Sequence, residues 1–298
     1  MGFLVVASER NHIEKLLNPR HCKETSRNAR VSTRRLSPGV SIDASSVVFE
    51  RWAVLKVALT FDDMNAFIPR AIVEELLELL KDTGIHSTLF VVPGNPSDRV
   101  STGKCVDLLV KAKMSGHEIG LHGYDHAKNE FGFLVPVPLP SLEAQCELLR
   151  KGRECLRNEI GESPIGFRAP NYRHSWVTLQ ALRSLGFKYD SSKTVFKPTG
   201  GMRFRVRTGI SPKPKRIGGT LFEIPVTGDY TNGLDPSCFS LRLARAKADY
   251  EWVKKLNGVF VLNCHPQVSG TLAIDFLRRL INELQKDTEF VRLSDLTS

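Results

Sequence analysis

The stretch VLKVALTFDD, residues 54–63, is an apolar run that ends in two adjacent carboxylates, Asp62 and Asp63. The run predicts a short buried strand with both aspartates at its carboxyl end. Because successive side chains on a strand point to opposite faces, we expect the two carboxylates to have separate tasks, one holding a metal ion and the other handling a proton. The alternative is that they only cap the helix that follows.

Apolar strands and amphipathic helices alternate along the rest of the chain. Helices are predicted at 69–83, 105–114, 141–160, 175–185, 240–256 and 274–284, and strands at 87–92, 118–121, 166–170, 187–190, 222–226, 258–262 and 290–293. This alternation is typical of βαβ units and indicates an α/β fold with a mostly parallel sheet. Reactive groups gather at the carboxyl ends of strands in such folds, and the polar residues at or just after the ends of predicted strands here are Asp62, Asp63, His122, Arg168, Asp190 and His265.

Two basic segments stand outside this pattern. Residues 1 to about 50 are polar and basic with little periodicity, so we interpret them as a poorly ordered extension with a small edge strand at Val47–Phe49. An arm that binds nucleic acid or a membrane surface is the alternative. From Lys193 to Lys215 the chain has prolines, glycines and cations but no acidic residue, and we interpret 193–220 as a basic insertion in a catalytic domain of residues 51–298.

The composition describes a basic chain with a substantial core. Its 298 residues are 41% hydrophobic, which suits one domain, such as a barrel of ~250 residues, or two smaller ones. The formal charge of +10 favours anionic partners, among them nucleic acid, anionic lipid surfaces and acidic glycans or sugar nucleotides. Nucleic acid is the less favoured of these, because the chain has no recognised binding motif or aromatic stacking platform.

The cysteines and the first residues favour a cytoplasmic location. The six cysteines include no C-x-x-C pair and lie mostly in apolar runs, which is typical of reduced, buried thiols. The segment Met1–Glu9 has a brief apolar run without a preceding positive region, too short for a secretory signal or a membrane span. We therefore expect a cytoplasmic protein without a transmembrane segment.

His122 and His126 form an H-x-x-x-H motif. On a helical turn both imidazoles project from one face and can bind one metal ion, which a carboxylate from another strand would complete. Three protein ligands leave positions open for water or substrate, as in a catalytic site. The alternative is a purely structural pair of histidines.

The remaining polar residues suggest acid–base chemistry on an amide. Water bound to a metal needs a base, for which Asp62 is a candidate, with Arg168 as the partner that orients it. The leaving amine needs an acid, for which His265 is a candidate, with Asp190 holding its imidazole in the protonated form. Taken singly, Arg168 could be a strand-end ion pair, Tyr172 an aromatic packed on the sheet and His265 a satisfied core residue.

The polar residues form five motifs in order: Thr60-Phe61-Asp62-Asp63, His122-x-x-x-His126, Arg168-Ala169-Pro170-Asn171-Tyr172, Tyr189-Asp190-Ser191-Ser192 and His265. Over residues 54–296 this set resembles the polysaccharide deacetylase family, also called the NodB-homology or carbohydrate esterase family 4 group. The resemblance implies a distorted (β/α) barrel and a divalent metal, usually zinc, that serves to remove N-acetyl groups from amino sugars.

The resemblance also implies roles for single residues. The metal ligands would be Asp63, His122 and His126. Asp62 would be the catalytic base, oriented by Arg168, and the backbone N–H of Tyr172 would help to hold the oxyanion. His265 would be the general acid, supported by Asp190.

Three positions depart from the family pattern. Met64 stands where the family usually has glycine, and Gly123 where it has serine or threonine. Asn263 stands two residues before His265, where polymer-active members commonly have a leucine that shapes the acetyl pocket, so we place Asn263 on the substrate side of the site. A tryptophan is not evident after Asp190.

We therefore expect a metal-dependent hydrolase that removes an N-acetyl group from an amino sugar in a glycan, lipid-linked saccharide or sugar nucleotide. The substrate would be a carbohydrate or another N-acylated small molecule, and an anionic one would suit the charge. A related amidohydrolase that acts on a non-sugar amide or imide is the alternative. A non-catalytic protein that binds carbohydrate or nucleic acid is less favoured, because every polar motif position is kept.

Overall fold

The structure is a computed structural model that describes residues 54–65, 67–94, 105–127, 129–133, 137–199 and 204–297. They belong to one compact unit, Trp52–Ser298. The predicted extension at 1–50 and the small strand at 47–49 lie outside the described residues.

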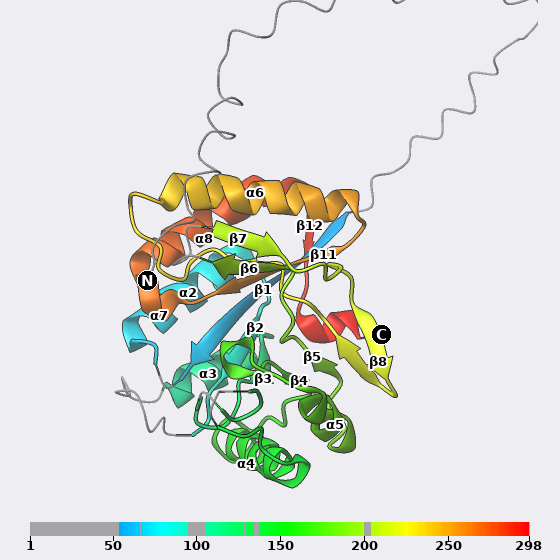
Figure 1. Ribbon diagram of the computed structural model, residues 1–298. Coiled ribbons are helices and arrows are strands. Elements are labelled where there is room, and N and C mark those ends of the chain that lie inside the picture. Colours follow the sequence, from blue (N-terminus) through cyan, green and yellow to red (C-terminus); the bar gives the residue numbers. More distant parts are fainter. Residues whose placement is uncertain are drawn as a thin grey trace, which may run out of the picture. The chain divides into compact units, whose positions relative to one another are not determined.

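A ten-stranded sheet organises this unit, in the order β10-β11-β1-β2-β3-β4-β5-β9-β8, and β12 also pairs with β1 (Figure 1). The strands are β1 (Leu55–Met64), β2 (Thr88–Val91), β3 (Glu118–Leu121), β4 (Gly166–Phe167), β5 (Tyr189–Asp190), β8 (Lys215–Gly218), β9 (Leu221–Glu223), β10 (Gly228–Asp229), β11 (Val259–Cys264) and β12 (Thr288–Phe290). All these pairings are parallel except that of β8 with β9. The predicted α/β class with mostly parallel strands is confirmed.

Six longer helices pack side by side in the order α6-α8-α2-α3-α4-α5, so each covers the sheet next to its neighbour. The helices are α2 (Arg70–Thr83), α3 (Val106–Met114), α4 (Leu142–Ile160), α5 (Trp176–Ser184), α6 (Phe239–Lys255) and α8 (Thr271–Leu284), with a single turn at α7 (Pro266–Ser269). Every helix predicted from 69 onward is present. Among the described residues, no helix combines the length and apolar character that crossing a membrane requires.

Local sequence signals explain where several helices begin and end. The Ser141 hydroxyl accepts a hydrogen bond from the Ala144 N–H at 3.2 Å and caps α4. Ser175 and Thr178 form a reciprocal capping box at the start of α5. Gly84 and Gly161 adopt left-handed conformations after α2 and α4, which glycine does without steric cost.

Strand β1 is buried on both faces. Val57, Leu59 and Phe61 belong to the core cluster that the helices cover. Ala58 belongs to a second cluster inside the curl of the sheet, which includes Phe90 of β2. Burial of each large apolar side chain contributes roughly 1.5–3 kcal/mol, so this strand is held firmly and its carboxyl end is a rigid platform.

The segment interpreted as a basic insertion is structured where it is described. β6 (Phe196–Thr199) and β7 (Phe204–Arg207) form an antiparallel hairpin, and β8 adds an edge strand to the main sheet. The hairpin is attached to α6, because Arg205 pairs with Asp249 and the Phe196 ring packs edge-on against Trp252. At least one cationic side chain of the hairpin, Arg205, is therefore paired within the fold.

Candidate active site

A bulge near the end of β1 places its two aspartates. The pairing with β2 shifts between Phe61 and Met64, and Asp63 has a φ of 59°. The expectation that Asp62 and Asp63 face opposite ways is wrong, because this left-handed residue breaks the alternation of the strand. Both carboxylates approach the same imidazole atom, His122 Nε2, at 4.0 Å from Asp62 Oδ2 and 3.3 Å from Asp63 Oδ1.

His122, His126 and Asp63 form a buried cluster. Asp63 Oδ1 lies 3.3 Å from His122 Nε2 and 2.9 Å from His126 Nε2, and each side chain is nearly inaccessible to solvent. The predicted helical turn is absent, because the segment from His122 to His126 is a loop and His126 has a φ of 61°. The two imidazoles nevertheless converge, as the motif predicted.

The donor atoms of this cluster fit a divalent cation. His122 Nδ1 lies 2.9 Å from the Arg168 carbonyl, which can only accept, so Nδ1 carries the proton and a neutral ring presents a lone pair at Nε2. That lone pair faces Asp63 Oδ1, which receives no hydrogen bond from any residue that the structure describes. A cation bound between these atoms would turn this repulsion into coordination, and two imidazoles with one carboxylate are a common zinc ligand set.

Asp63 is held as a carboxylate in this position. Burial by itself would raise the pKa of Asp63, but with no metal bound, imidazoles that carry a proton at Nε2 would hold that pKa well below its usual range. Its other oxygen, Oδ2, accepts a hydrogen bond from Gln267 Nε2 at 2.7 Å. Gln267 was not singled out in the sequence, because a lone glutamine on a short helix carries no motif.

Asp62 lies beside the cluster and binds different partners. Its Oδ1 accepts from Arg168 Nη1 at 2.7 Å, and its Oδ2 accepts from Asn263 Nδ2 at 2.7 Å. The predicted contact between Arg168 and Asp62 is therefore present in the structure. Burial opposes ionisation, but Arg168 and the nearby imidazoles of His122 and His265 lower the pKa of Asp62, so the carboxyl group stays ionised.

Arg168 is fully buried and its donors are almost all used. Besides Asp62, it donates to Thr60 Oγ1 at 2.8 Å, and to the carbonyl and hydroxyl of Ser191 at 3.0 and 2.9 Å. The guanidinium carbon also lies 4.2 Å from the centre of the Phe90 ring. Thr60 and Ser191 thus hold Arg168 in the position from which it binds Asp62. The sequence gives no sign of this role, because the residues come from different parts of the chain.

Asn263 belongs to the network around Asp62, and its placement on the substrate side is corrected. The side chain is fully buried, its Oδ1 accepts from Arg168 Nη1 at 2.8 Å, and its Nδ2 donates to both Asp62 and the Tyr172 hydroxyl. The physical reason is that Asn263 pairs with Thr60 in the register of β1 and β11, two residues before Asp62. An amide there satisfies the buried arginine and carboxylate, which a leucine could not.

Tyr172 enters the site through its hydroxyl. The backbone N–H that was predicted to hold an oxyanion donates instead to the Ala169 carbonyl at 3.0 Å, within a short turn where Asn171 and Tyr172 have φ values of 54° and 57°. The hydroxyl oxygen accepts from Asn263 Nδ2 at 2.5 Å, so its own proton is left for another acceptor. Burial raises the pKa of this hydroxyl well above its usual range and keeps it protonated.

His265 has a different partner from the predicted one. Its Nδ1 lies 2.6 Å from Asp229 Oδ2, whereas Asp190 Oδ1 accepts from Ser192 Oγ at 2.5 Å. The order of the sheet explains this, because β10 with Asp229 is the direct neighbour of β11, while β5 with Asp190 lies on the far side of β4. Burial disfavours the imidazolium, but Asp229 raises the pKa of His265 to about 9.

Asp229 was missed in the sequence, although a usable signal exists. It follows the strand predicted at 222–226 after only a few residues, in the same position relative to its strand as the other site residues. Asp190, for its part, is fully buried and burial raises its pKa to about 6.

Gly123, which departs from the family pattern, is required by the fold. Its φ is 68°, and a Cβ there would lie 2.3 Å from Glu130 Oε2 and 2.6 Å from Pro170 Cγ. Glu130 Oε1 in turn accepts from the backbone N–H groups of Tyr124 and Asp125 at 2.8 and 2.9 Å. A buried glutamate therefore shapes the loop between the two histidines.

A pocket of about 540 Å³ lies next to this network. Tyr172 and Asp229 form part of its wall, and its cationic lining residues are Arg173, Lys193 and Lys197. The pocket therefore connects the proposed acid–base groups with positively charged side chains that reach solvent. Tyr172 and Asp229, the partner of His265, thus border a space large enough for a substrate.

Comparison with known proteins gives a consistent result. A family profile described as "Polysaccharide deacetylase" matches residues 54–189. A peptidoglycan deacetylase of Helicobacter pylori is 31% identical over 252 residues, which are 74% of this chain and 79% of that protein. A chitin deacetylase of Pestalotiopsis sp is 29% identical over 130 residues, which are 44% of this chain and 39% of that protein.

A solved structure is similar in fold. A Mycobacterium smegmatis protein, provisionally named a polysaccharide deacetylase, superposes with a TM-score of 0.63 at 22% identity over 88% of this chain and 94% of that chain. At this identity the likeness establishes the fold alone. It agrees with the predicted distorted barrel, seen here as a curled, mostly parallel sheet with helices around it.

Proposed function

Since the chain belongs to the polysaccharide deacetylase family, a family of hydrolases that act on carbon–nitrogen bonds, we propose that this protein removes the N-acetyl group of an amino sugar and releases acetate. One observation carries the proposal. The neighbouring carboxylates accept hydrogen bonds from different residues: Asp62 accepts from Arg168 and Asn263, whereas Asp63 accepts from Gln267 and lies closest to the two imidazoles.

We propose zinc as the ion for Asp63, His122 and His126. When bound, a divalent metal supplies a Lewis acid and lowers the pKa of a water molecule. Asp62, kept ionised and held by Arg168 and Asn263, takes up the proton of the attacking water. This division leaves the metal ligands and the base as different residues.

The opposite proton transfer falls to His265. Its Nδ1 is fixed by Asp229, so Nε2 is the atom that donates a proton to the leaving amine. Nε2 lies 3.9 Å from Asp62 Oδ2, which puts the acid and the base within reach of one amide bond. The Tyr172 hydroxyl keeps its proton for a substrate oxygen, a role that replaces the one predicted for its backbone N–H.

The pocket beside Asp229 suggests how the rest of the substrate is bound. We propose that it takes the sugar, and that Arg173 and Lys197 contact an anionic group such as the phosphate of a sugar nucleotide or a lipid-linked saccharide. Lys197 is exposed and has no acidic partner among the ion pairs of the described residues. A cytoplasmic location, predicted from the cysteines and the first residues, stays a prediction that cell fractionation can test.

The proposal is tested by incubating zinc-loaded protein with a panel of N-acetylated sugars and measuring acetate. The panel contains a neutral oligosaccharide, a sugar nucleotide and a lipid-linked saccharide, with a cyclic imide to probe the alternative activity. We expect acetate from at least one sugar and none with Asp62→Asn. Folded, metal-loaded protein that releases no acetate from any sugar would refute the proposal, and hydrolysis of the imide alone would support the alternative.

A further inference from the structure

A second group of potential metal ligands lies outside the site described above. It consists of His174, Asp190 and Glu223, whose ligand atoms all lie within 4.8 Å of one another. Asp190 and Glu223 are direct neighbours in the parallel pair of β5 and β9, and His174 follows the turn that carries Tyr172. None of the three belongs to the cluster of Asp63, His122 and His126.

The two carboxylates each have one oxygen without a hydrogen bond. Asp190 Oδ1 accepts from Ser192 Oγ at 2.5 Å and Glu223 Oε1 from the Lys193 backbone N–H at 3.3 Å. Asp190 Oδ2 and Glu223 Oε2 are buried and receive no hydrogen bond within the described part of the chain. Their residues are 0% and 3% exposed, so water from bulk solvent does not compensate them.

Lys193 provides only partial compensation. Its ammonium lies 3.2 Å from Glu223 Oε2, and its side chain is 33% exposed. One lysine does not compensate two ionised carboxylates here, since burial raises the pKa of Asp190 to about 6, and burial together with Asp190 raises the pKa of Glu223 to about 7. Asp190 Oδ2 therefore has no hydrogen-bond partner among the described residues, and Glu223 Oε2 faces only Lys193, so both oxygens could bind a further cation.

His174 would be the third metal ligand, and it lies on the wall of a pocket. Its Nδ1 lies 3.3 Å from the Tyr172 carbonyl, which can only accept, so a neutral ring has its lone pair at Nε2. The residue is half-buried and lines the pocket of about 540 Å³, from which an ion could reach the carboxylates. One imidazole and two carboxylates form a ligand set that suits zinc and similar divalent ions.

We propose that His174, Asp190 and Glu223 bind a second divalent cation, with zinc as the best-matched class. The ligand atoms would have to approach one another by roughly 1 Å to reach the spacing of a tetrahedral zinc site, which turning of Lys193 toward solvent allows. The ion would tie β5 and β9 to the turn at Asn171 and Tyr172, and so hold the Tyr172 hydroxyl in place against Asn263. Its role is positional.

Metal analysis of the full chain tests this site. We expect zinc-saturated wild-type protein to bind two equivalents after removal of free metal, and His174→Gln, Glu223→Gln and His126→Ala to bind one each. His86→Gln is the matched control, because His86 is an exposed histidine away from both clusters and should leave two equivalents. One equivalent in wild type, or two in Glu223→Gln, would overturn the proposal.

Lys193 supplies a second, independent comparison. If the cluster binds a metal ion, Lys193→Met removes a competing cation and retains the second equivalent with unchanged or tighter affinity. If Lys193 is the cation that the cluster was built for, Lys193→Met lowers the melting temperature and binds only one equivalent, and the proposal fails. Anomalous diffraction at the zinc edge then locates the ion, with a peak between His174 and Glu223 expected and a peak only at His126 contradicting the second site.

Discussion

The two ends of the parallel strands carry buried polar groups of opposite kinds. At the amino ends, Glu118 Oε2 accepts from Thr88 Oγ1 at 2.8 Å and from the Ser294 N–H at 3.0 Å, and Glu118 Oε1 accepts from the Tyr189 hydroxyl at 2.8 Å. At the carboxyl ends, oxygens of Asp63 and other buried acids receive no hydrogen bond from the described residues. The complete pairing of Glu118 suits a network that serves stability, whereas the free oxygen of Asp63, beside two imidazoles, leaves a position for a ligand.

Two histidines show the same contrast. His117 Nδ1 accepts from the Ser87 N–H at 3.2 Å, and burial together with His86 lowers the pKa of His117 to about 4, so this ring stays neutral. His265 is held by Asp229, which raises its pKa to about 9. One imidazole is a structural acceptor, whereas the other is kept as an acid.

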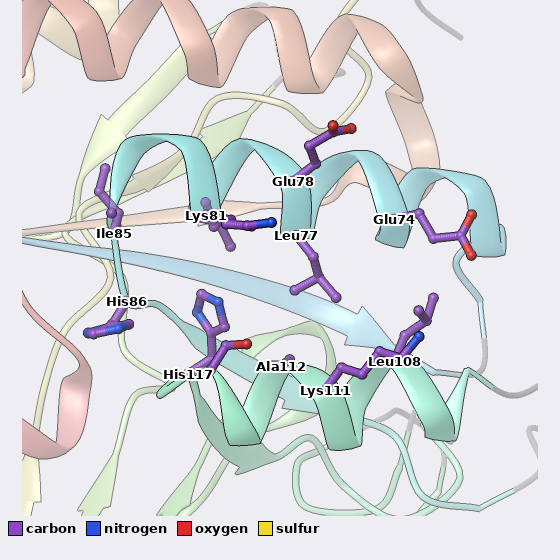
Figure 2. Close-up of a pocket in the computed structure, with 13 residues that line it drawn as sticks. Glu74, Leu77, Glu78, Lys81, Ile85, His86, Leu108, Lys111, Ala112 and His117 are labelled. Carbon is purple, nitrogen blue, oxygen red and sulfur yellow. The ribbon is translucent and has the colours of Figure 1, made fainter.

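The presence of a pocket does not by itself distinguish the amino ends of the strands from their carboxyl ends. A pocket of about 520 Å³ lies between α2 and α3, where His86 and His117 line it together with Leu77 and Leu108 (Figure 2). It has about the same volume as the pocket beside Asp229 but contains none of the predicted site residues. The convergence of charged groups, and not the size of the cavity, identifies the active site.

The largest expected effect is on kcat, and it distinguishes the general base Asp62 from the metal ligand His122 at the carboxyl ends of the strands. Asp62→Asn should lower kcat by about 10³-fold because the general base is lost, while its metal content stays at the wild-type value. His122→Ala should lose the metal ion of its cluster. Activity assays with metal analysis of both proteins check this, and equal metal loss in the two variants would show that Asp62 is also a ligand.

The next effect concerns the amino ends. Glu118→Ala should lower the free energy of unfolding by about 3 kcal/mol, since the donors of Thr88, Tyr189 and Ser294 lose their buried acceptor. The folded variant should keep the wild-type kcat. Denaturant unfolding measures the loss, with Tyr189→Phe as the milder control at about 1 kcal/mol. A large fall in kcat for Glu118→Ala would break the division between the two ends.

A smaller change in rate is expected from the partner of His265. Asp229→Asn should lower kcat by about 10- to 100-fold and move the alkaline limb of the pH profile downward from about 9, because the imidazolium loses its carboxylate. Asp190→Asn should leave that limb in place. A shift of the limb in Asp190→Asn but not in Asp229→Asn would restore the pairing predicted from the sequence.

The last effect is a difference in sign between the pH dependences that the two histidines give to stability, at most about 3 kcal/mol each. The folded pKa of His265 is above the ordinary 6.5, so its stabilising effect is complete below pH 6.5 and is lost as the pH rises toward 9. The folded pKa of His117 is below 6.5, so its effect is complete above pH 6.5 and is lost as the pH falls toward 4.

Unfolding of metal-free protein over this pH range measures both effects. Wild type is compared with His265→Gln and with His117→Gln at each pH. The two differences in unfolding free energy should change in opposite directions. If both differences change in the same direction with pH, the fold does not favour the protonated form of His265 and the neutral form of His117.

Much of the site could be predicted because its signals are local. An apolar run followed by acids identified the end of β1, and the spacing of His122 and His126 predicted their convergence even though the turn between them is not helical. Arg168 was predicted to contact Asp62, and it does. These features depend on chain neighbours and on the rule that parallel strands end at one edge.

The sequence by itself thus determined the α/β class, the helices and the strand ends from which the site is built. Only the tertiary structure decided that Asp229 and not Asp190 meets His265, that Asn263 binds Asp62 and Arg168, and that Asp63 leaves the strand pattern at a bulge. The physical reason is that periodicity and capping are encoded within a few residues. The order of strands and their register depend instead on packing between segments far apart in the chain, such as those of Asn263 and Asp62, which are 201 positions apart.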